Sequence, residues 1–151
     1  MIGEDIVAQG SVEERLSKEG IYISKTRGIS MRPLFKTHRD AVMIAPPSRE
    51  LRKYDVVLYT YGDGRYILHR IIGFKGDVCL IRGDNTYKLE RVPKERIIGI
   101  AVAFNRNGKR YDMTEVSYKF YSRVWNFIYP IRYLAVMARR VLSKIKHKIF
   151  K

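Results

Sequence analysis

The sequence predicts a mainly β fold, a coiled antiparallel sheet or partial barrel with a short N-terminal helix and a basic helical tail. Short apolar runs alternate with glycine and asparagine turns through the middle of the chain. The length of 151 residues suits one domain with an appendage. The last 36 residues contain no Asp or Glu. We therefore expect three parts: an N-terminal helix region at 1–20, a β domain at 21–115 and a basic amphipathic helical tail at 116–151.

The first helix is predicted at residues 11–19. Ser11 and Glu14 have the spacing of a capping box, in which the two side chains satisfy free backbone N–H groups at a helix start. Gly20 follows at a position where a left-handed residue commonly ends a helix.

Six or seven short strands are predicted after it. Pro46 and Pro47 close the second candidate strand, since proline cannot continue a sheet ladder. Tight turns are expected at 62–64, 75–77 and 105–108, and the last of these contains an Asn-Gly pair. The candidate strands are 21–25, 39–45, 55–61, 65–74, 78–82, 97–104 and 109–113.

The tail has apolar residues at helical spacing from residue 131 onward, with Arg and Lys largely on other faces. An aromatic cluster of Trp125, Phe127 and Tyr129 precedes this stripe, and Pro130 is expected to separate two helical segments. Three roles stay open: docking of the stripe on the β domain, binding to an anionic membrane surface, and binding to nucleic acid. The stripe residues are Ile131, Leu134, Ala135, Ala138, Leu142, Ile145 and Ile149.

The net charge of +15 predicts a polyanionic partner, either nucleic acid or an anionic membrane surface. The single cysteine, Cys79, excludes an internal disulfide and suits a reducing compartment. The N-terminus shows no secretory signal, and no run approaches the roughly 18 apolar residues of a membrane span. We expect a cytoplasmic protein, with peripheral attachment to the inner face of the membrane as an option. The scattered histidines and cysteine predict no metal site, and no cofactor is expected.

A candidate nucleophile lies in the stretch 28–34, which reads Gly-Ile-Ser-Met-Arg-Pro-Leu. Gly28 permits backbone conformations closed to other residues, and Pro33 can open a short helical turn, so Ser30 is held between them. Serine needs a base within roughly 2.6–3.2 Å to act as a nucleophile. The best candidate is His69, which shares a strand face with Ile67 and Ile71 and should be half buried.

Two carboxylates are candidates for the residue that orients the base. Asp84 lies in an Arg-Gly-Asp-Asn turn, where it could also hydrogen-bond its own backbone. Glu90 lies six residues later beside Arg91, where a surface ion pair is the ordinary explanation.

The order of these motifs resembles the signal peptidase I and LexA-like serine peptidase superfamily. The resemblance covers about residues 21–104 and is strongest for the histidine-base signal peptidases of the endoplasmic reticulum and archaea. The motifs are Gly-Ile-Ser-Met-Arg-Pro at 28–33, Tyr-Asp-Val-Val at 54–57, His-Arg-Ile-Ile-Gly at 69–73, Arg-Gly-Asp-Asn at 82–85 and Ile-Ile-Gly at 97–99.

This resemblance implies that Ser30 is the nucleophile and His69 the general base, with an acid at Glu90 and support from Asp84. Glutamate in place of the usual aspartate leaves the third role open between Glu90 and Asp84. Gly28 stands where many signal peptidases offer a serine hydroxyl to the oxyanion, so backbone N–H groups including that of Ser30 must serve. The family usually carries a transmembrane anchor, and the basic tail could replace it.

The function predicted is therefore a signal-peptidase-like serine endopeptidase acting on a leader or signal-like peptide, with small residues before the cut. The alternative is a catalytically silent β domain that binds a peptide or a membrane. A DNA-associated regulator is less favoured, because no helix-turn-helix fits before Ile21 and the basic residues concentrate in the apolar-striped tail.

Overall fold

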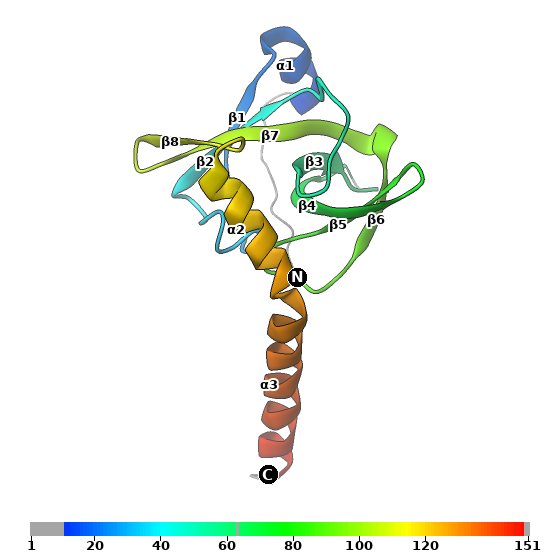
Figure 1. Ribbon diagram of the computed structural model, residues 1–151, viewed down its shortest axis with the longest axis vertical. Helices are drawn as coiled ribbons and strands as arrows, with labels where there is room; N and C mark the ends of the chain where they lie inside the picture. Colours follow the sequence, from blue (N-terminus) through cyan, green and yellow to red (C-terminus); the bar gives the residue numbers. More distant parts are fainter. Residues whose placement is uncertain (1–10, 63, 150–151) are drawn as a thin grey trace.

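The computed structural model describes residues 11–62 and 64–149 and shows a coiled antiparallel sheet with three α-helices (Figure 1). The predicted mainly β class is confirmed. Residue 63 of the expected turn at 62–64, and residues 1–10 of the expected N-terminal region, lie outside the described residues. The elements are α1 (Val12–Glu19), β1 (Tyr22–Lys25), β2 (Asp40–Ala45), β3 (Val56–Thr60), β4 (Tyr66–Lys75), β5 (Val78–Arg82), β6 (Glu90–Pro93), a 3-10 turn (Lys94–Arg96), β7 (Ile97–Arg106), β8 (Lys109–Asp112), α2 (Val116–Phe127) and α3 (Tyr129–Ile149).

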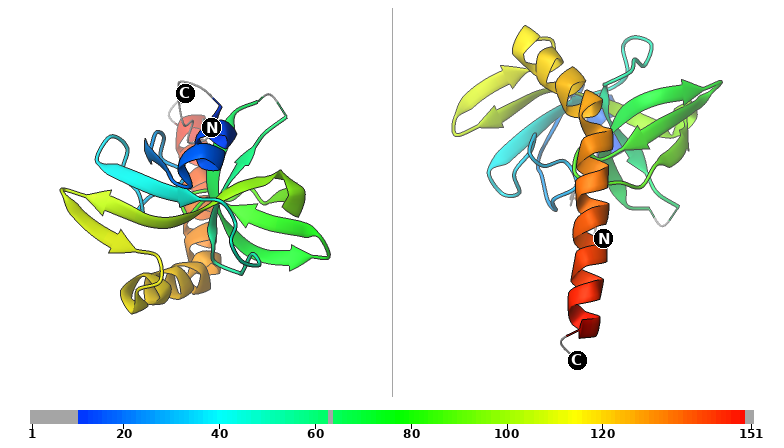
Figure 2. Two further views of the ribbon diagram at one scale, coloured as in Figure 1. Left: turned by 90° about the horizontal axis from the view of Figure 1, so that it is seen from above. Right: turned by 60° about the horizontal axis from the view of Figure 1, so that its bottom comes forward.

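The strand order is β1-β2-β7-β3-β4-β5-β6, with β8 paired to β7, and each pair is antiparallel. The long strand β7 bonds to β2, β3 and β8, so it ties the two halves of the sheet together. Figure 2 shows from above that the sheet coils as a half-barrel. Strand β6 is the one strand that the sequence analysis did not predict, and it pairs with β5 from Glu90 to Pro93.

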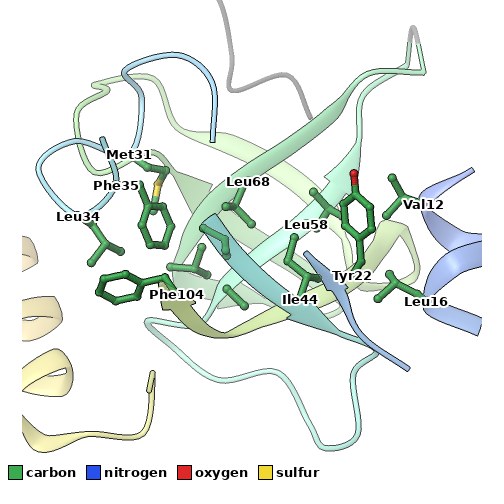
Figure 3. Close-up of a cluster of buried hydrophobic side chains, with 13 residues drawn as sticks. Val12, Leu16, Tyr22, Met31, Leu34, Phe35, Ile44, Leu58, Leu68 and Phe104 are labelled. Atoms are coloured by element: carbon green, nitrogen blue, oxygen red, sulfur yellow. The ribbon is translucent and has the colours of Figure 1, made fainter. Parts of the chain in front are cut away.

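The first helix begins and ends where its capping residues predict. The Ser11 hydroxyl accepts a hydrogen bond from the Glu14 N–H at 3.3 Å. Gly20 has φ 71°, and its N–H donates to the Leu16 carbonyl at 3.0 Å. Val12 and Leu16 are buried and attach α1 to the sheet (Figure 3).

Two hydrophobic clusters fill the interior, and β4 contributes to both because its side chains alternate between faces. Leu68 belongs to the cluster shown in Figure 3, together with Met31 and Phe35 from the loop after β1. Ile67 and Ile71 belong to the second cluster. His69 therefore lies on the face of the second cluster. Arg70, the next residue along β4, points to the face of the first cluster.

The tail forms two helices that behave differently. Helix α2 packs Tyr118 and Tyr121 against the first cluster, whereas α3 extends away from the domain (Figures 1 and 2). The break falls at Ile128, and Pro130 lies in the first turn of α3, where its missing N–H costs no helical bond. None of the described helices is both long and apolar enough to cross a membrane.

Of the three roles left open for the tail, docking of the apolar stripe from residue 131 on the β domain does not occur in this structure. Ile131 is 70% exposed and Leu134 is 65% exposed. Docking is carried instead by the aromatic residues of α2 and by the first turns of α3, where Arg132 donates to the Asp84 carbonyl and Tyr133 packs on Tyr87.

Candidate functional site

Ser30 lies in a turn that the core holds in place. The Arg32–Pro33 peptide bond in this turn is cis, and Pro33 does not open the helical turn that the sequence predicts. The Phe35 N–H donates to the Met31 carbonyl at 3.0 Å, and Arg32 N–H donates to the Ile29 carbonyl at 3.2 Å. Met31 and Phe35 are fully buried, and burying such side chains stabilises the turn by about 1.5–3 kcal/mol each. The Ser30 side chain is consequently fixed relative to the sheet.

The structure brings Ser30 and His69 together. Oγ of Ser30 lies 3.0 Å from Nε2 of His69, which is hydrogen-bond distance between residues 39 apart in the sequence. His69 lies on β4 opposite Val57 of β3. Its exposed fraction is 4%, so the prediction of a half-buried ring is corrected. The reason is that β4 is covered on both of its faces.

A tyrosine that the sequence analysis missed contacts the other nitrogen of the ring. The hydroxyl oxygen of Tyr59 lies 3.2 Å from Nδ1 of His69, and the same hydroxyl donates a hydrogen bond to Glu90. Glu90 Oε2 itself lies 3.9 Å from Nδ1. Tyr59 is two residues after Val57 and so shares its face, which makes it a diagonal neighbour of His69. The pairing of β3 with β4 is therefore the feature from which the contact between Tyr59 and His69 could have been predicted.

The direction of these hydrogen bonds fixes the tautomer of His69. The Tyr59 phenol has one proton, and an ionised carboxylate can only accept, so the phenol donates to Glu90. Its oxygen then accepts from Nδ1–H of His69. Nε2 is left with a lone pair, which can accept the proton of the Ser30 hydroxyl.

Burial and charge set the protonation of the site. Burial lowers the pKa of His69 below its ordinary value, and it outweighs the opposing charges of Glu90 and Asp84. The imidazole is therefore neutral at neutral pH and able to act as a base. Burial, together with the hydrogen bond to Glu90, raises the pKa of Tyr59 above its usual range, so the phenol keeps its proton.

Asp84 is directed away from His69 and into a separate buried ion pair. Its two carboxylate oxygens accept hydrogen bonds from Nε and Nη2 of Arg70 at 2.7 and 2.8 Å. Tyr121 also donates to this carboxylate at 3.0 Å. The Asp84 backbone carbonyl accepts from Trp125 at 2.9 Å and from Arg132 at 2.7 Å. Asp84 thus joins the sheet to both tail helices, and the geometry places Glu90, not Asp84, beside the Tyr59 hydroxyl.

The turn around Asp84 nevertheless supports Ser30 through its backbone. The Asn85 N–H donates to the Ser30 carbonyl at 2.7 Å, and the Asn85 side-chain amide donates to the Ile29 carbonyl at 3.1 Å. A Cβ on Gly83 would lie 2.7 Å from the Ser30 carbonyl oxygen and 3.0 Å from Nε2 of His69. Only glycine allows the turn to approach both residues this closely.

Gly28 is conformationally required where the resemblance predicts a serine. Its φ is 84°, a left-handed value that costs other residues about 1–2 kcal/mol. The Ser30 N–H donates no hydrogen bond to any other residue within 11–62 and 64–149. Within the described residues, that N–H is therefore an unused donor beside the Ser30 hydroxyl.

No group of three metal-ligating side chains lies close together among the residues described by the structure. Comparison with protein-family models, with curated proteins and with solved structures gave no match for this chain. The geometry of the Ser30 site and the order of its motifs are therefore the basis for a function.

Proposed function

We propose that this chain is a serine endopeptidase in which Ser30 is the nucleophile, His69 the general base and Glu90 the acid that acts through Tyr59. The observation that carries this proposal is the 3.0 Å contact between Ser30 Oγ and His69 Nε2. It joins a hydroxyl to a buried imidazole whose tautomer suits a base. A nucleophile, a base and an orienting acid within reach of one another are the parts that acyl transfer needs.

The reaction proceeds in two halves. Ser30 Oγ attacks the carbonyl carbon of a peptide bond while its proton passes to His69 Nε2, and the tetrahedral oxyanion is stabilised by the Ser30 N–H. His69 then gives that proton to the departing amine, leaving an acyl-enzyme. In the second half, water attacks the ester of the acyl-enzyme and loses a proton to His69. That proton returns to Ser30 as the acid product leaves.

Tyr59 and Glu90 stabilise the charged state of His69. When His69 gains a proton it becomes a buried cation, which is costly without a partner. The Tyr59 oxygen accepts its Nδ1–H, and the negative charge of Glu90 at 3.9 Å offsets the new charge. Glu90 reaches the ring through the phenol, so the longer glutamate arm does not need to contact His69 directly.

The substrate class comes from the resemblance to the signal peptidase and LexA-like superfamily. We assign the coiled sheet to that structural type and the substrate to a leader or signal-like peptide with small residues before the cut. The support is the order of the motifs and the meeting of Ser30 and His69, which are 39 residues apart in the chain. The histidine base matches the endoplasmic-reticulum and archaeal branch.

Labelling by a fluorophosphonate, followed by intact mass and peptide mapping, tests the proposal. We expect one adduct on Ser30, none on Ser30→Ala, and at least about a hundredfold slower labelling of His69→Ala, in line with the weight of general-base catalysis. His38→Asn is the matched histidine control, because His38 has φ 62° and asparagine tolerates that conformation. Equal labelling of His69→Ala would contradict the proposal and favour the catalytically silent binding domain.

A further inference from the structure

The outer face of the two tail helices carries a continuous row of exposed apolar side chains. Phe120 is 69% exposed and Phe127 is 84% exposed, which is unusual for phenylalanine in water. The row starts on α2, well before the stripe that the sequence analysis recognised, and its members recur every three or four residues, with one interval of eight between Leu134 and Leu142, as on one face of a helix. They are Val116, Phe120, Val124, Phe127, Ile131, Leu134, Leu142 and Ile145.

The opposite face of α2 explains why this row is left uncovered. Tyr118 and Tyr121 pack on the core, Ser122 is buried, and Trp125 donates to the Asp84 carbonyl at 2.9 Å. These contacts use the whole inner face of α2 and fix its rotation. The apolar row therefore points outward, and among the described residues the β domain meets it only at one edge, where Lys53 and Arg82 line a pocket with Val124 and Phe127.

Cations border the apolar row on both sides. Lys119 and Arg123 are exposed on α2, and Arg139 is exposed on α3. From the helical spacing, Lys119 and Arg123 flank one edge of the row and Arg139 flanks the other. No Asp or Glu occurs after Glu115. An apolar face with basic borders is the pattern of helices that lie in the interface of an anionic bilayer.

A pocket at the junction of α2 and α3 adds a site for an anion. It has a volume of about 670 Å³, and its lining includes Lys53, Arg82 and Arg123 but no carboxylate. Arg82 contacts neutral groups: its guanidinium lies 3.2 Å from the ring centroid of Tyr129 and donates to the Asn126 amide oxygen at 3.2 Å. Phe127, in the middle of the apolar row, also lines this pocket.

From these observations we propose that the outer face of α2 and α3 lies in the interface of an anionic phospholipid bilayer and that the pocket of Lys53, Arg82 and Arg123 receives a lipid phosphate. The apolar row enters the boundary of the acyl chains, while the bordering cations reach the headgroups. This proposal is independent of the peptidase chemistry, since none of its residues belongs to the Ser30 site.

Neither duplex nucleic acid nor a second copy of the chain matches both the charge and the apolar area of this surface. Duplex nucleic acid would neutralise the cations but would leave large apolar side chains such as Phe120 and Phe127 facing a phosphate backbone. A second copy would cover the apolar row, but it would place two acid-free basic helices side by side, where like charges repel and no opposite charge pairs them. A bilayer with anionic headgroups satisfies both the charge and the apolar area.

Vesicle flotation of the full chain tests this surface without any measurement of catalysis. We expect binding to an equal mixture of phosphatidylglycerol and phosphatidylcholine, little binding to phosphatidylcholine alone, and weakening by salt. Phe120→Ser with Phe127→Ser should lower the affinity by more than about tenfold, because each substitution removes a large apolar side chain that would be buried in the bilayer. Ile21→Ser with Ile23→Ser is the matched control, since both residues are exposed apolar residues at and just before β1.

The pocket has its own pair of variants. Lys53→Gln with Arg123→Gln should lower the affinity for the anionic vesicles about thirtyfold, at roughly 1 kcal/mol for each of the two cations near the surface. Lys75→Gln with Arg110→Gln removes the same net charge from exposed positions outside the pocket and should have a much smaller effect. Equal losses in the two pairs would overturn the phosphate site, because bulk charge would then explain the binding.

Three further outcomes would overturn the membrane assignment itself. Unchanged flotation of the double Phe variant, with circular dichroism showing a native fold, would mean that the apolar row does not enter the bilayer. Sedimentation equilibrium showing a dimer that the double Phe variant abolishes would assign the row to a second copy. Salt-dependent binding to duplex DNA that is tighter than binding to the vesicles would assign the basic borders to nucleic acid.

Discussion

Tyr59 stands between His69 and the nearest carboxylate: its hydroxyl oxygen lies 3.2 Å from Nδ1 of His69, and its proton is donated to Glu90. A Ser-His-acid site normally has the acid directly on the imidazole. Here a neutral phenol transmits the hydrogen bond. The phenol therefore fixes the tautomer of His69, and in the proposed mechanism it is a positioning residue.

Replacing Tyr59 with phenylalanine should lower kcat by about 10 to 100-fold, which corresponds to losing roughly 1.5–3 kcal/mol of a hydrogen bond to a charged group. KM should change little, because the ring and its packing stay. The nitrogen NMR spectrum of His69 should show loss of the Nδ1–H tautomer. Tyr61→Phe is the control, since Tyr61 is on the same segment but exposed. An unchanged tautomer and kcat would show that Tyr59 only fills space.

The pH dependence of kcat/KM should report the buried base. Burial lowers the pKa of His69, so the neutral ring persists below pH 6.5 and the acid limb of the profile should lie below that value. The negative charge of Glu90 opposes this shift. Glu90→Gln should therefore move the limb to still lower pH while reducing the maximal rate. A limb that stays in place would mean that Glu90 does not act on the ring.

A methyl group on Gly83 should damage catalysis far more than stability. Its Cβ would lie 2.7 Å from the Ser30 carbonyl oxygen, so the turn must move away and take Ser30 with it. Displacements of this size commonly cost about a hundredfold in rate. Gly73→Ala is the matched control, because its Cβ would meet only Leu80 Cδ1 at 3.6 Å, an ordinary contact. Comparable kcat for the two variants would refute the close approach.

Loss of Asp84 should lower stability, whereas loss of Glu90 should lower kcat, and this difference distinguishes the two candidate acids. Asp84→Ala removes the partner of the fully buried Arg70, and such a loss costs about 3–5 kcal/mol in the free energy of unfolding. Glu90→Gln should lower kcat with a much smaller change in the midpoint of urea denaturation. A stable Asp84→Ala variant with reduced kcat would instead move Asp84 into the catalytic site.

Much of the sheet could be predicted because local rules determine it. Ser11 and Gly20 bound α1 as their capping roles require, and glycine turns separate the strands near the expected limits. Strand β6 was missed because its sequence, Glu-Arg-Val-Pro, carries two charges and a proline. It is a strand only through its pairing with β5, which is a tertiary interaction.

The candidate site also has a part that the sequence predicts and a part that depends on tertiary structure. Ser30 and His69 were paired from motif order, and the structure places them 3.0 Å apart, whereas the choice between Glu90 and Asp84 stayed open in the sequence. The choice depends on the direction of the Arg70 side chain. Arg70 points to the face of the first core cluster, where it donates two hydrogen bonds to the Asp84 carboxylate. Tyr59 was overlooked because a tyrosine within an apolar strand is usually a packing residue. The exposed row on α2 was hidden by the aromatic residues interleaved with it, which face inward.

A further carboxylate should control stability in acid. Asp40 begins β2 and is fully buried, and although burial opposes its ionisation, hydrogen bonds from Arg39, Arg106 and the Lys36 N–H lower its pKa to about 2. Because the folded pKa lies below the unfolded value near 3.9, ionised Asp40 stabilises the fold above that value. This contribution, roughly 2 kcal/mol, should disappear as the pH falls from about 4 to 2.

Urea denaturation of the wild type and of Asp40→Asn across this pH range measures the effect. The wild type should lose stability steadily below about pH 4, whereas the difference between the two proteins should shrink as Asp40 becomes protonated. Asp77→Asn is the control, because Asp77 is 98% exposed and its bond to Lys94 lies in water. A difference between wild type and Asp40→Asn that stays constant down to pH 2 would show that the Arg106 contact does not depend on the charge of Asp40.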